Sequence, residues 1–280
     1  MTELRRRMTQ DLQIRNYSPK TVKIYLGLVG EFAKYFGRPP DQLGPEDVRR
    51  FQVYLVEEKK VSSSYLKQYV AALRFFFGKT LGRDVPPRLV PYPRKKKSLP
   101  VVLSPGEVLE LFKVCKNVKH RVILMTTYSA GLRLSEVANL RIVDIDSARM
   151  KIRVQEGKGR KDRYLPLSER LLGALREYWL LCRPCVWLFP GAGGDRPIPG
   201  RSIQKICRKA VLRAGLRKRV TVHTLRHSFA THHLEGGTDM MLLKELMGHT
   251  SLNTTSHYTH LGSAALDAVK SPLDRLPPID

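Results

Sequence analysis

A histidine and an arginine three positions apart, His223 and Arg226, form the first pair in the sequence that could act together on one chemical group. At the start of a helix, residues with this spacing lie on the same face. An arginine can bind two oxygens of a phosphate at once, and a histidine exchanges protons near pH 7. The pair is therefore suited to an anionic substrate such as a phosphodiester.

Two further cations occur where the chain is expected to turn. Arg133 follows a glycine at the end of an apolar segment, so its side chain can enter a cleft; capping a helix or pairing with Glu136 is the alternative. Lys158 stands between two glycines at the tip of an expected hairpin, where it could enter a DNA groove and donate a proton. An ordinary solvated lysine is the alternative at this position.

The last segment with chemical character begins at Gly248, which is expected to end a helix. His249 follows as a loop residue, and Tyr258 lies nine residues farther on, in a short helix expected over 252–260. A tyrosine hydroxyl can act as a nucleophile. Packing in the core is the usual role of a single tyrosine, so Tyr258 gains its interest from the other residues.

Together these segments resemble the tyrosine recombinase family, also called the phage-integrase or Xer-like family. The family pattern is an Arg after Gly-Leu, a hairpin Lys, a His-x-x-Arg, a later Gly-His and a Tyr nine residues on. This sequence has all six residues in that order: Arg133, Lys158, His223, Arg226, His249 and Tyr258. The resemblance extends to the N-terminal segment SPKTVKIYL and covers nearly the whole chain.

The resemblance implies a site-specific DNA recombinase that needs neither a metal nor another cofactor. Tyr258 would attack the scissile phosphate to give a 3′-phosphotyrosyl intermediate, and Lys158 would protonate the leaving 5′-oxygen. The two arginines would bind the non-bridging oxygens, His223 would assist proton transfer at Tyr258, and His249 would bond the phosphate. Exchange would pass through a Holliday junction, for integration and excision or for dimer resolution.

The resemblance also implies partners and a setting. A homo-tetramer would bind double-stranded DNA half-sites, and a different recombinase as a second partner is left open. The protein would act in the cytoplasm, associated with the nucleoid. A type IB topoisomerase-like enzyme and a non-catalytic helix-turn-helix regulator are the alternatives. The regulator gives Arg133, Lys158 and Tyr258 no role. The target DNA sequence cannot be read from the chain.

The elements that must position these residues are mainly α-helices with a small antiparallel β-sheet. Residues 1–90 show helical periodicity in four segments and should form a bundle, which the resemblance identifies as a SAM-like core-binding domain. Residues 91–103 are rich in proline and cations, which is typical of a linker. Residues 104–280 should form a mixed α/β catalytic domain, with strands at 150–154 and 163–167.

The charge agrees with a nucleic-acid partner. The chain has 280 residues and a formal net charge of +25. Residues 1–93 carry +8, residues 94–97 add +4 and the remainder carries +13, so the cations are not confined to a tail. A folded, basic chain usually binds a polyanion. With 42% hydrophobic residues and no long apolar run, the sequence excludes a disordered basic protein and a membrane-spanning one.

We expect no catalytic role for the cysteines, for the further histidines or for the other residues near the expected site. No metal site is expected from the cysteines, which should be buried or half-buried thiols: Cys115, Cys182, Cys185 and Cys207. The remaining histidines of the His223 segment should pack or face solvent: His227, His232 and His233. Glu136 should brace Arg133, and Lys161 and Arg163 should contact DNA backbone or solvent.

The tail, residues 261–280, follows closely behind Tyr258. Residues 263–270 read as a short helix that carries too few apolar residues to fold alone, so it must dock on another surface. The resemblance implies that it crosses to a neighbouring protomer, and docking on its own catalytic domain is the alternative.

Overall fold

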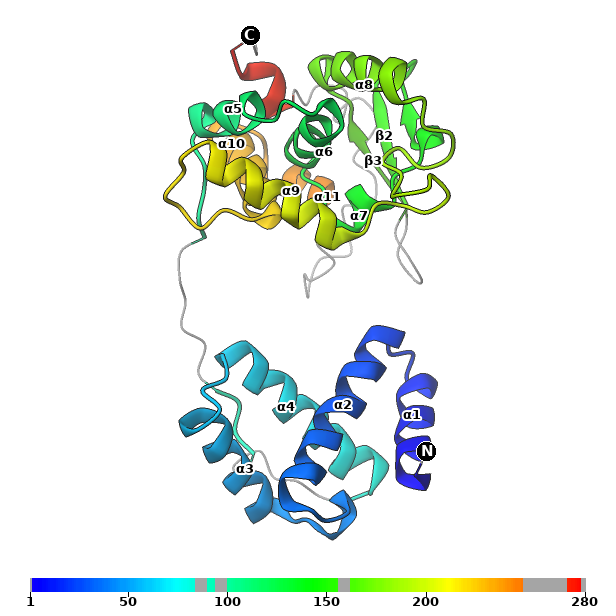
Figure 1. Ribbon diagram of the computed structural model, residues 1–280, viewed down its shortest axis with the longest axis vertical. Helices are drawn as coiled ribbons and strands as arrows, with labels where there is room; N and C mark the ends of the chain where they lie inside the picture. The colour runs from blue at the N-terminus through cyan, green and yellow to red at the C-terminus, as the bar shows by residue number, and fades with distance from the viewer. Residues whose placement is uncertain (1, 84–89, 94–99, 156–161, 249–270, 278–280) are drawn as a thin grey trace. The chain divides into compact units, whose positions relative to one another are not determined.

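The structure is a computed structural model that describes all residues except 1, 84–89, 94–99, 156–161, 249–270 and 278–280. The chain divides into two compact units, Met1–Ser98 and Leu99–Asp280, and the division lies within the segment 91–103. The described elements are helices and a single three-stranded antiparallel sheet (Figure 1), which confirms the predicted fold class. No described helix is both long and apolar enough to cross a membrane.

The first unit is a small helical bundle. Its elements are α1 (Glu3–Ile14), α2 (Pro19–Phe36), η1 (Pro40–Gln42), α3 (Pro45–Glu57), α4 (Ser63–Phe75) and the π-helical turn η2 (Phe76–Thr80). Helices α2 and α4 begin at serine caps, because the hydroxyls of Ser18 and Ser62 each accept a hydrogen bond of 3.2 Å from the N–H three residues later. Aromatic residues such as Phe32, Phe51 and Tyr69 fill the core between the helices.

The second unit carries the residues of chemical interest. Its helices are α5 (Pro105–Lys113), α6 (Val118–Ser129), α7 (Leu134–Ala138), η3 (Ile142–Asp144), α8 (Glu169–Cys182), α9 (Gly200–Arg213), α10 (Val222–Glu235), α11 (Met240–Met247) and η4 (Pro272–Arg275). Its strands are β1 (Ile145–Asp146), β2 (Lys151–Val154) and β3 (Arg163–Pro166).

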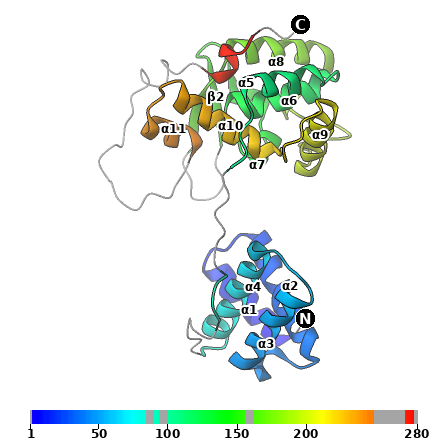
Figure 2. The same cartoon turned by 90° about the vertical axis from the view of Figure 1, so that its left-hand side faces the viewer.

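Helix α6 is the centre of this unit. Every residue from Val122 to Ser129 is buried, because α5, α7, α8, α9, α10 and η4 all pack against it (Figures 1 and 2). The side chain of Asn117 caps its first turn by accepting a hydrogen bond of 3.0 Å from the N–H of His120. A helix enclosed on all sides holds its C-terminal end firmly, and that end leads directly to Arg133.

The sheet is an antiparallel meander in the order β1-β2-β3. Ile152 of β2 pairs with Ile145 of β1 on one side and with Leu165 of β3 on the other. Strands β2 and β3 confirm the predicted hairpin, whereas β1 was not predicted because two residues are too short to show alternation. The tip of the hairpin, with Lys158, lies outside the described residues.

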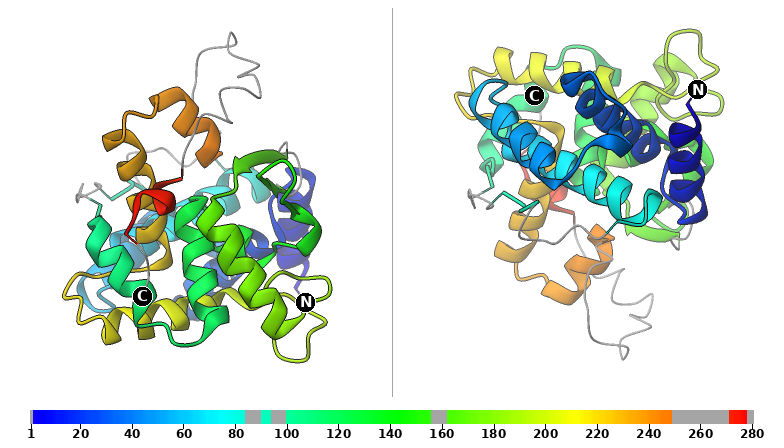
Figure 3. Two further views of the ribbon diagram at one scale, coloured as in Figure 1. Left: turned by 90° about the horizontal axis from the view of Figure 1, so that it is seen from above. Right: turned by 90° about the horizontal axis from the view of Figure 1, so that it is seen from below.

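The end of the chain returns to the second unit. Ser271 donates a hydrogen bond of 2.9 Å to the carbonyl of Ser129 at the end of α6, and Leu276 is buried. Asp274 accepts hydrogen bonds from the hydroxyl of Ser168 and, at 3.3 Å, from the N–H of Arg170 at the start of α8. Segment η4 therefore docks on its own chain (Figure 3). The helix expected over 263–270 lies outside the described residues.

Candidate active site

The turn after α6 places Arg133 at the start of α7. Gly131 adopts a left-handed conformation with φ +57°, and Arg133 is the N-cap residue of α7. The backbone N–H of Arg133 donates a hydrogen bond of 2.8 Å to Oε2 of Glu136. Helix α7 begins at Leu134, and the Glu136 carboxylate caps its first turn from inside the helix.

Glu136 is shared by three arginines from three elements. Nη1 of Arg133 lies 2.6 Å from Oε1. Arg163 of β3 donates to both oxygens, 3.1 Å from Nη1 to Oε1 and 2.9 Å from Nη2 to Oε2. Nη1 of Arg226 lies 3.8 Å from Oε2. The Glu136 side chain is 9% exposed, so one nearly buried carboxylate gathers guanidinium groups that are far apart in the sequence.

The charge state of Glu136 follows from these neighbours. Burial favours the neutral acid and would raise its pKa, but hydrogen bonds from Arg163 and from the backbone of Arg133 outweigh burial. The pKa of Glu136 is therefore lower than its ordinary value of 4.5. The carboxylate is ionised at neutral pH and can hold the arginines by charge as well as by geometry.

The same three arginines also bind the end of α11. Arg163 Nε donates to the carbonyl of residue 246 at 3.0 Å, Arg226 Nη2 to that of residue 247 at 2.5 Å, and Arg133 Nη2 to that of Gly248 at 2.5 Å. These are successive carbonyls at the C-terminus of a helix, which lack partners within the helix and carry partial negative charge. The arginines are thus fixed between Glu136 and the end of α11.

His223 lies in the first turn of α10, the helix that carries Arg226. Thr221 caps α10 with its hydroxyl, and the exposed His223 packs against His227 with ring centroids 4.5 Å apart. Partial burial, followed by the electrostatic effects of His227 and of the cationic Arg226 and Arg133, lowers the pKa of His223 below its ordinary value of 6.5. At neutral pH the ring is therefore mostly uncharged, as an acceptor of a proton must be.

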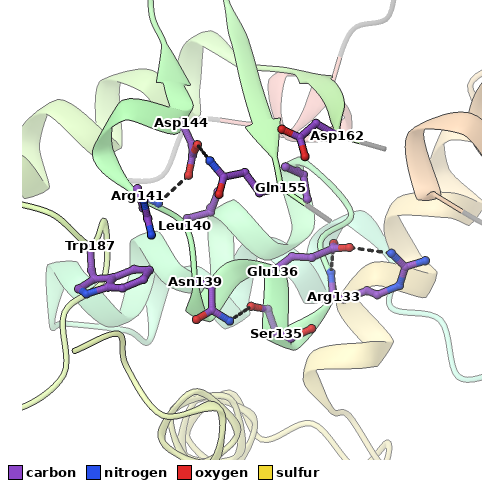
Figure 4. A pocket seen from close by; sticks show the side chains of 11 residues that line it. Arg133, Ser135, Glu136, Asn139, Leu140, Arg141, Asp144, Gln155, Asp162 and Trp187 are labelled. Atoms are coloured by element: carbon purple, nitrogen blue, oxygen red, sulfur yellow. Dashed lines mark hydrogen bonds and ion pairs between the residues drawn. The ribbon is translucent and has the colours of Figure 1, made fainter. Parts of the chain in front are cut away.

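A cleft of about 550 Å³ opens beside Arg133 (Figure 4). Its lining comes from α7, the sheet and the segment before α9, and it includes Ser135, Asn139, Arg141, Gln155, Asp162 and Trp187. The Arg133 side chain is 29% exposed, whereas that of Arg226 is 2% exposed. Of the two arginines predicted to bind phosphate, Arg133 is the more accessible.

The structure thus brings together half of the predicted site. Arg133 and Arg226 meet at Glu136, and their charges act on His223. The other predicted residues lie outside the described part of the chain: Lys158, His249 and Tyr258. Their described neighbours do reach this region, because Gln155 and Asp162 line the cleft and Gly248 binds Arg133.

Arg163 corrects the sequence analysis. It was expected to contact DNA backbone or solvent, yet its side chain is 10% exposed and pairs with Glu136. The strand period contains the missing signal, because Arg163 lies two residues before the buried Leu165 and so on the same face of β3. Glu136 does brace Arg133, as predicted, and it binds two further arginines as well.

The other histidines have structural roles, as predicted. His232 accepts at Nδ1 a hydrogen bond of 2.7 Å from the Tyr128 hydroxyl and donates from Nε2 to the carbonyl of Leu103 at 2.9 Å, since a carbonyl can only accept. Nδ1 of His233 and the Thr238 hydroxyl are 2.9 Å apart. No cluster of three or more metal-binding side chains occurs among the residues that the structure describes.

The cysteines fit their prediction only in part. Cys115 and Cys207 are buried, and burial raises the pKa of the Cys207 thiol to about 12. Cys182 and Cys185 are exposed instead, because Cys182 is the last residue of α8 and the chain turns outward at Arg183 with φ 42°.

Comparison with known proteins covers nearly all of the chain. Residues 102–264 match the Phage integrase family, and residues 4–87 match the family described as Phage integrase, N-terminal SAM-like domain. The protein of Sinorhizobium fredii named as integrase/recombinase y4qK is 48% identical over 99% of this chain and 90% of its own length. A tyrosine recombinase of Thermosipho africanus is 32% identical over 92% of this chain and 94% of its own length.

Solved structures agree with these sequences. The crystal structure of XerA recombinase superposes with a TM-score of 0.53 at 31% identity, covering 95% of each chain. A lambda integrase dimer bound to a core site gives a TM-score of 0.71 at 16% identity, which supports the fold only. Relatives of nearly full length named tyrosine recombinase favour a recombinase over a DNA-relaxing topoisomerase or a non-catalytic regulator. The chain therefore belongs to the phage integrase family and is a tyrosine site-specific recombinase, an enzyme that breaks and rejoins DNA strands.

Proposed function

We propose that six residues of this chain carry out strand cleavage: Arg133, Lys158, His223, Arg226, His249 and Tyr258. The Tyr258 oxygen attacks the scissile phosphorus, the bond to the 5′-oxygen breaks, and a 3′-phosphotyrosyl bond forms. Lys158 gives a proton to the leaving 5′-oxygen. Attack by the 5′-hydroxyl of the partner strand then reverses these steps, so the energy of the phosphodiester is kept in the covalent intermediate.

One observation carries the proposal, namely the meeting of Arg133 and Arg226 on the two oxygens of Glu136, at 2.6 and 3.8 Å. Two guanidinium groups held side by side by a carboxylate can also bind the two non-bridging oxygens of one phosphate. Charge grows on those oxygens as the pentacoordinate transition state forms. Donors that are already fixed in place stabilise that charge without reorganisation.

His223 is proposed to assist proton removal from Tyr258, and His249 to bond the phosphate. The lowered pKa of His223 supports its part, because an uncharged imidazole can accept the tyrosine proton near pH 7. Arg133 and Arg226 have a second effect here, since their charges contribute to the lowering of that pKa.

Double-stranded DNA is the proposed substrate, and charge supports it. Residues 196–234 contain ten Lys and Arg residues and no Asp or Glu. Helix α9 exposes five of these cations: Arg201, Lys205, Arg208, Lys209 and Arg213. A basic stripe of this kind binds the phosphate backbone. Residues 1–90 are proposed as the core-binding domain, 91–103 as the linker and 104–280 as the catalytic domain, the first and last each contacting DNA.

The proposed active form is a tetramer that exchanges strands through a Holliday junction. One supporting observation is that lambda integrase, a neighbour in fold, has been solved as a tetramer bound to a Holliday junction. XerH has been solved bound to its difH substrate. By this proposal the enzyme works on DNA in the cytoplasm, with a second recombinase as a further partner to be tested, and requires no cofactor.

The test is a suicide substrate that traps the covalent intermediate, with Tyr258→Phe as the variant. Loss of the covalent adduct with unchanged DNA binding is the expected result, because only the hydroxyl is removed. Tyr164→Phe is the matched control, since Tyr164 is an exposed tyrosine of β3 in the same unit. An undiminished adduct from Tyr258→Phe would overturn the assignment.

A further inference from the structure

Of the three arginines that the structure describes at Glu136, Arg163 has no part in the proposed mechanism. It lies on β3, which follows the segment of the sequence that contains Lys158, and its side chain is 10% exposed. Its fork spans both oxygens of Glu136 at 3.1 and 2.9 Å, while Nε reaches the carbonyl of Leu246 at 3.0 Å. One planar group therefore joins the hairpin, the first turn of α7 and the end of α11.

The hydrogen bonds around Glu136 show the effect of the Arg163 contacts. Arg163 and Arg133 together donate four hydrogen bonds to the carboxylate, two to each oxygen. An ionised carboxylate has about four acceptor positions, so these are filled. Arg226 is left at 3.8 Å, beyond normal hydrogen-bond length. The occupancy of Glu136 by Arg163 and Arg133 keeps Arg226 from being drawn fully onto the carboxylate.

Arg163 also fixes the position of α11 relative to the sheet. The carbonyl that it binds directly precedes the two carbonyls that Arg226 and Arg133 bind. A shift of α11 along its axis would change the partners of all three arginines together. Helix α11 also packs directly against β3, the strand that carries Arg163.

We propose that Arg163 is a positioning residue for strand cleavage, which sets Glu136 and the end of α11 so that Arg133 and Arg226 meet the scissile phosphate in the right geometry. The proposal rests on the phosphate-binding role given above to those two arginines. Lysine should not replace Arg163, because a single ammonium group cannot span both Glu136 oxygens and the Leu246 carbonyl in one plane.

The test compares Arg163→Lys with Arg153→Lys. Arg153 is a matched control: it lies on the neighbouring strand and pairs with the buried Asp144 at 3.0 Å, away from Glu136. Single-turnover cleavage of the suicide substrate is measured at saturating protein, and DNA affinity is measured at several salt concentrations. We expect cleavage by Arg163→Lys to fall about 10- to 100-fold, because small misplacement of catalytic groups has effects of this order. Affinity and its salt dependence should not change, and Arg153→Lys should behave like the wild type.

A substrate with a neutral methylphosphonate at the scissile position separates positioning from general loss of structure. It has one charged oxygen fewer for the arginines to stabilise, so the ratio of wild-type to Arg163→Lys cleavage rates should shrink on it. A merely structural role predicts the same ratio on both substrates. A phosphate contact by Arg163 itself predicts that Arg163→Gln, which removes the positive charge, binds DNA more weakly and with a salt slope reduced by about one. Either of these results would overturn the proposal.

Two controls keep the result decisive. Wild-type enzyme and Arg133→Ala are assayed on the same DNA. A covalent adduct with the wild type and its loss with Arg133→Ala would support phosphate binding by the two arginines. That result would stand even if Arg163→Lys cleaved normally and the positioning role of Arg163 failed. If Arg163→Lys melts below the assay temperature, the cleavage rates on both substrates are measured with Arg163→Gln instead, and they decide between the two roles. Unfolding of both variants would make Arg163 a residue of stability and would also overturn the proposal.

Discussion

The backbone carbonyl of Gly131 accepts a hydrogen bond of 2.5 Å from Nη1 of Arg226. The turn that presents Arg133 thus also holds the second arginine, and it does so through a residue without a side chain. Gly131 has φ +57°, and a Cβ added to it would lie 2.4 Å from Cδ1 of Phe229, on the same helix as Arg226. The close approach of this turn to α10 requires glycine on both counts.

Gly131→Ala should therefore weaken both folding and cleavage. We expect a loss of about 1–3 kcal/mol in unfolding free energy, because overpacking and a left-handed alanine both cost energy. Cleavage should fall further than the loss of folded protein explains, since Arg226 is displaced. Urea unfolding and suicide-substrate cleavage measure the two effects. Gly173→Ala in α8 is the control, because nothing lies within 4 Å of its added Cβ; wild-type stability for Gly131→Ala would contradict the prediction.

Removing either of the two arginines proposed to bind phosphate should cost cleavage far more than DNA binding. Arg133→Ala and Arg226→Ala should each cleave about 10²- to 10³-fold more slowly, the usual effect of losing one preorganised donor. Affinity should fall modestly because many other cations contact the backbone. Arg226→Ala should unfold more easily than Arg133→Ala, since the Arg226 side chain is 2% exposed and that of Arg133 is 29% exposed. A variant that cleaves at the wild-type rate but binds weakly would make its arginine a docking residue.

Local signals in the sequence predicted the elements well. Helix α6 coincides with an apolar run of the sequence, and Ser104 and Glu107 form a capping box with hydrogen bonds of 2.8 and 3.2 Å. These features depend on residues within one or two turns. The six-residue pattern predicted the side chains of the candidate site, and three of these residues lie in the described region.

Contacts over long separations could not be predicted in the same way. Glu136 and Arg163 are 27 positions apart, and Arg133 and the Gly248 carbonyl are 115 apart. No local period encodes that three arginines share one carboxylate or that they cap α11. The burial of Arg163 was within reach of the strand period, but a charged residue on an inward face is normally read as exposed.

The acid sensitivity of the second unit should depend on Glu136. Its pKa is lowered in the folded state, so its contribution to stability is present above 4.5 and is lost as pH falls through the folded value. Urea unfolding of the wild type and Glu136→Gln between pH 3 and 7 measures this. Near neutral pH we expect the unfolding free energy of Glu136→Gln to be about 3–5 kcal/mol lower than that of the wild type, since breaking a buried ion pair leaves uncompensated charge. The difference should narrow in acid, and a constant difference would contradict the prediction.

Lys158 can be tested as the general acid without disturbing binding. A substrate with a bridging 5′-phosphorothiolate has a sulfur leaving group that needs little protonation. Cleavage of this substrate by Lys158→Ala should approach the wild-type rate, while the normal substrate is cleaved slowly. Lys161→Ala is the control on the same loop. Rescue of Lys161→Ala but not of Lys158→Ala would assign the acid to the other lysine.

The docked end of the chain changes how the tail must be tested. Ser271, Asp274 and Leu276 bind the second unit of their own chain, whereas the family resemblance implies exchange of the tail between protomers. Truncation after Gly262 would remove both the segment 263–270 and this anchor. A loss of activity on truncation would therefore not distinguish an intersubunit contact from the loss of a local one.

Asp274→Ala separates the two contributions. It removes the hydrogen bonds from Ser168 and Arg170 at the start of α8, and loss of such a cap costs about 0.5–2 kcal/mol. We expect Asp274→Ala to lower thermal stability while leaving cooperative binding to paired half-sites intact. Truncation after Gly262 should lower both, with binding to a single half-site nearly unchanged. Gel shifts on single and paired half-sites give the measurement. Cooperativity that is equal with and without the tail would reject the intersubunit role, because the anchor would then be the tail's whole contribution.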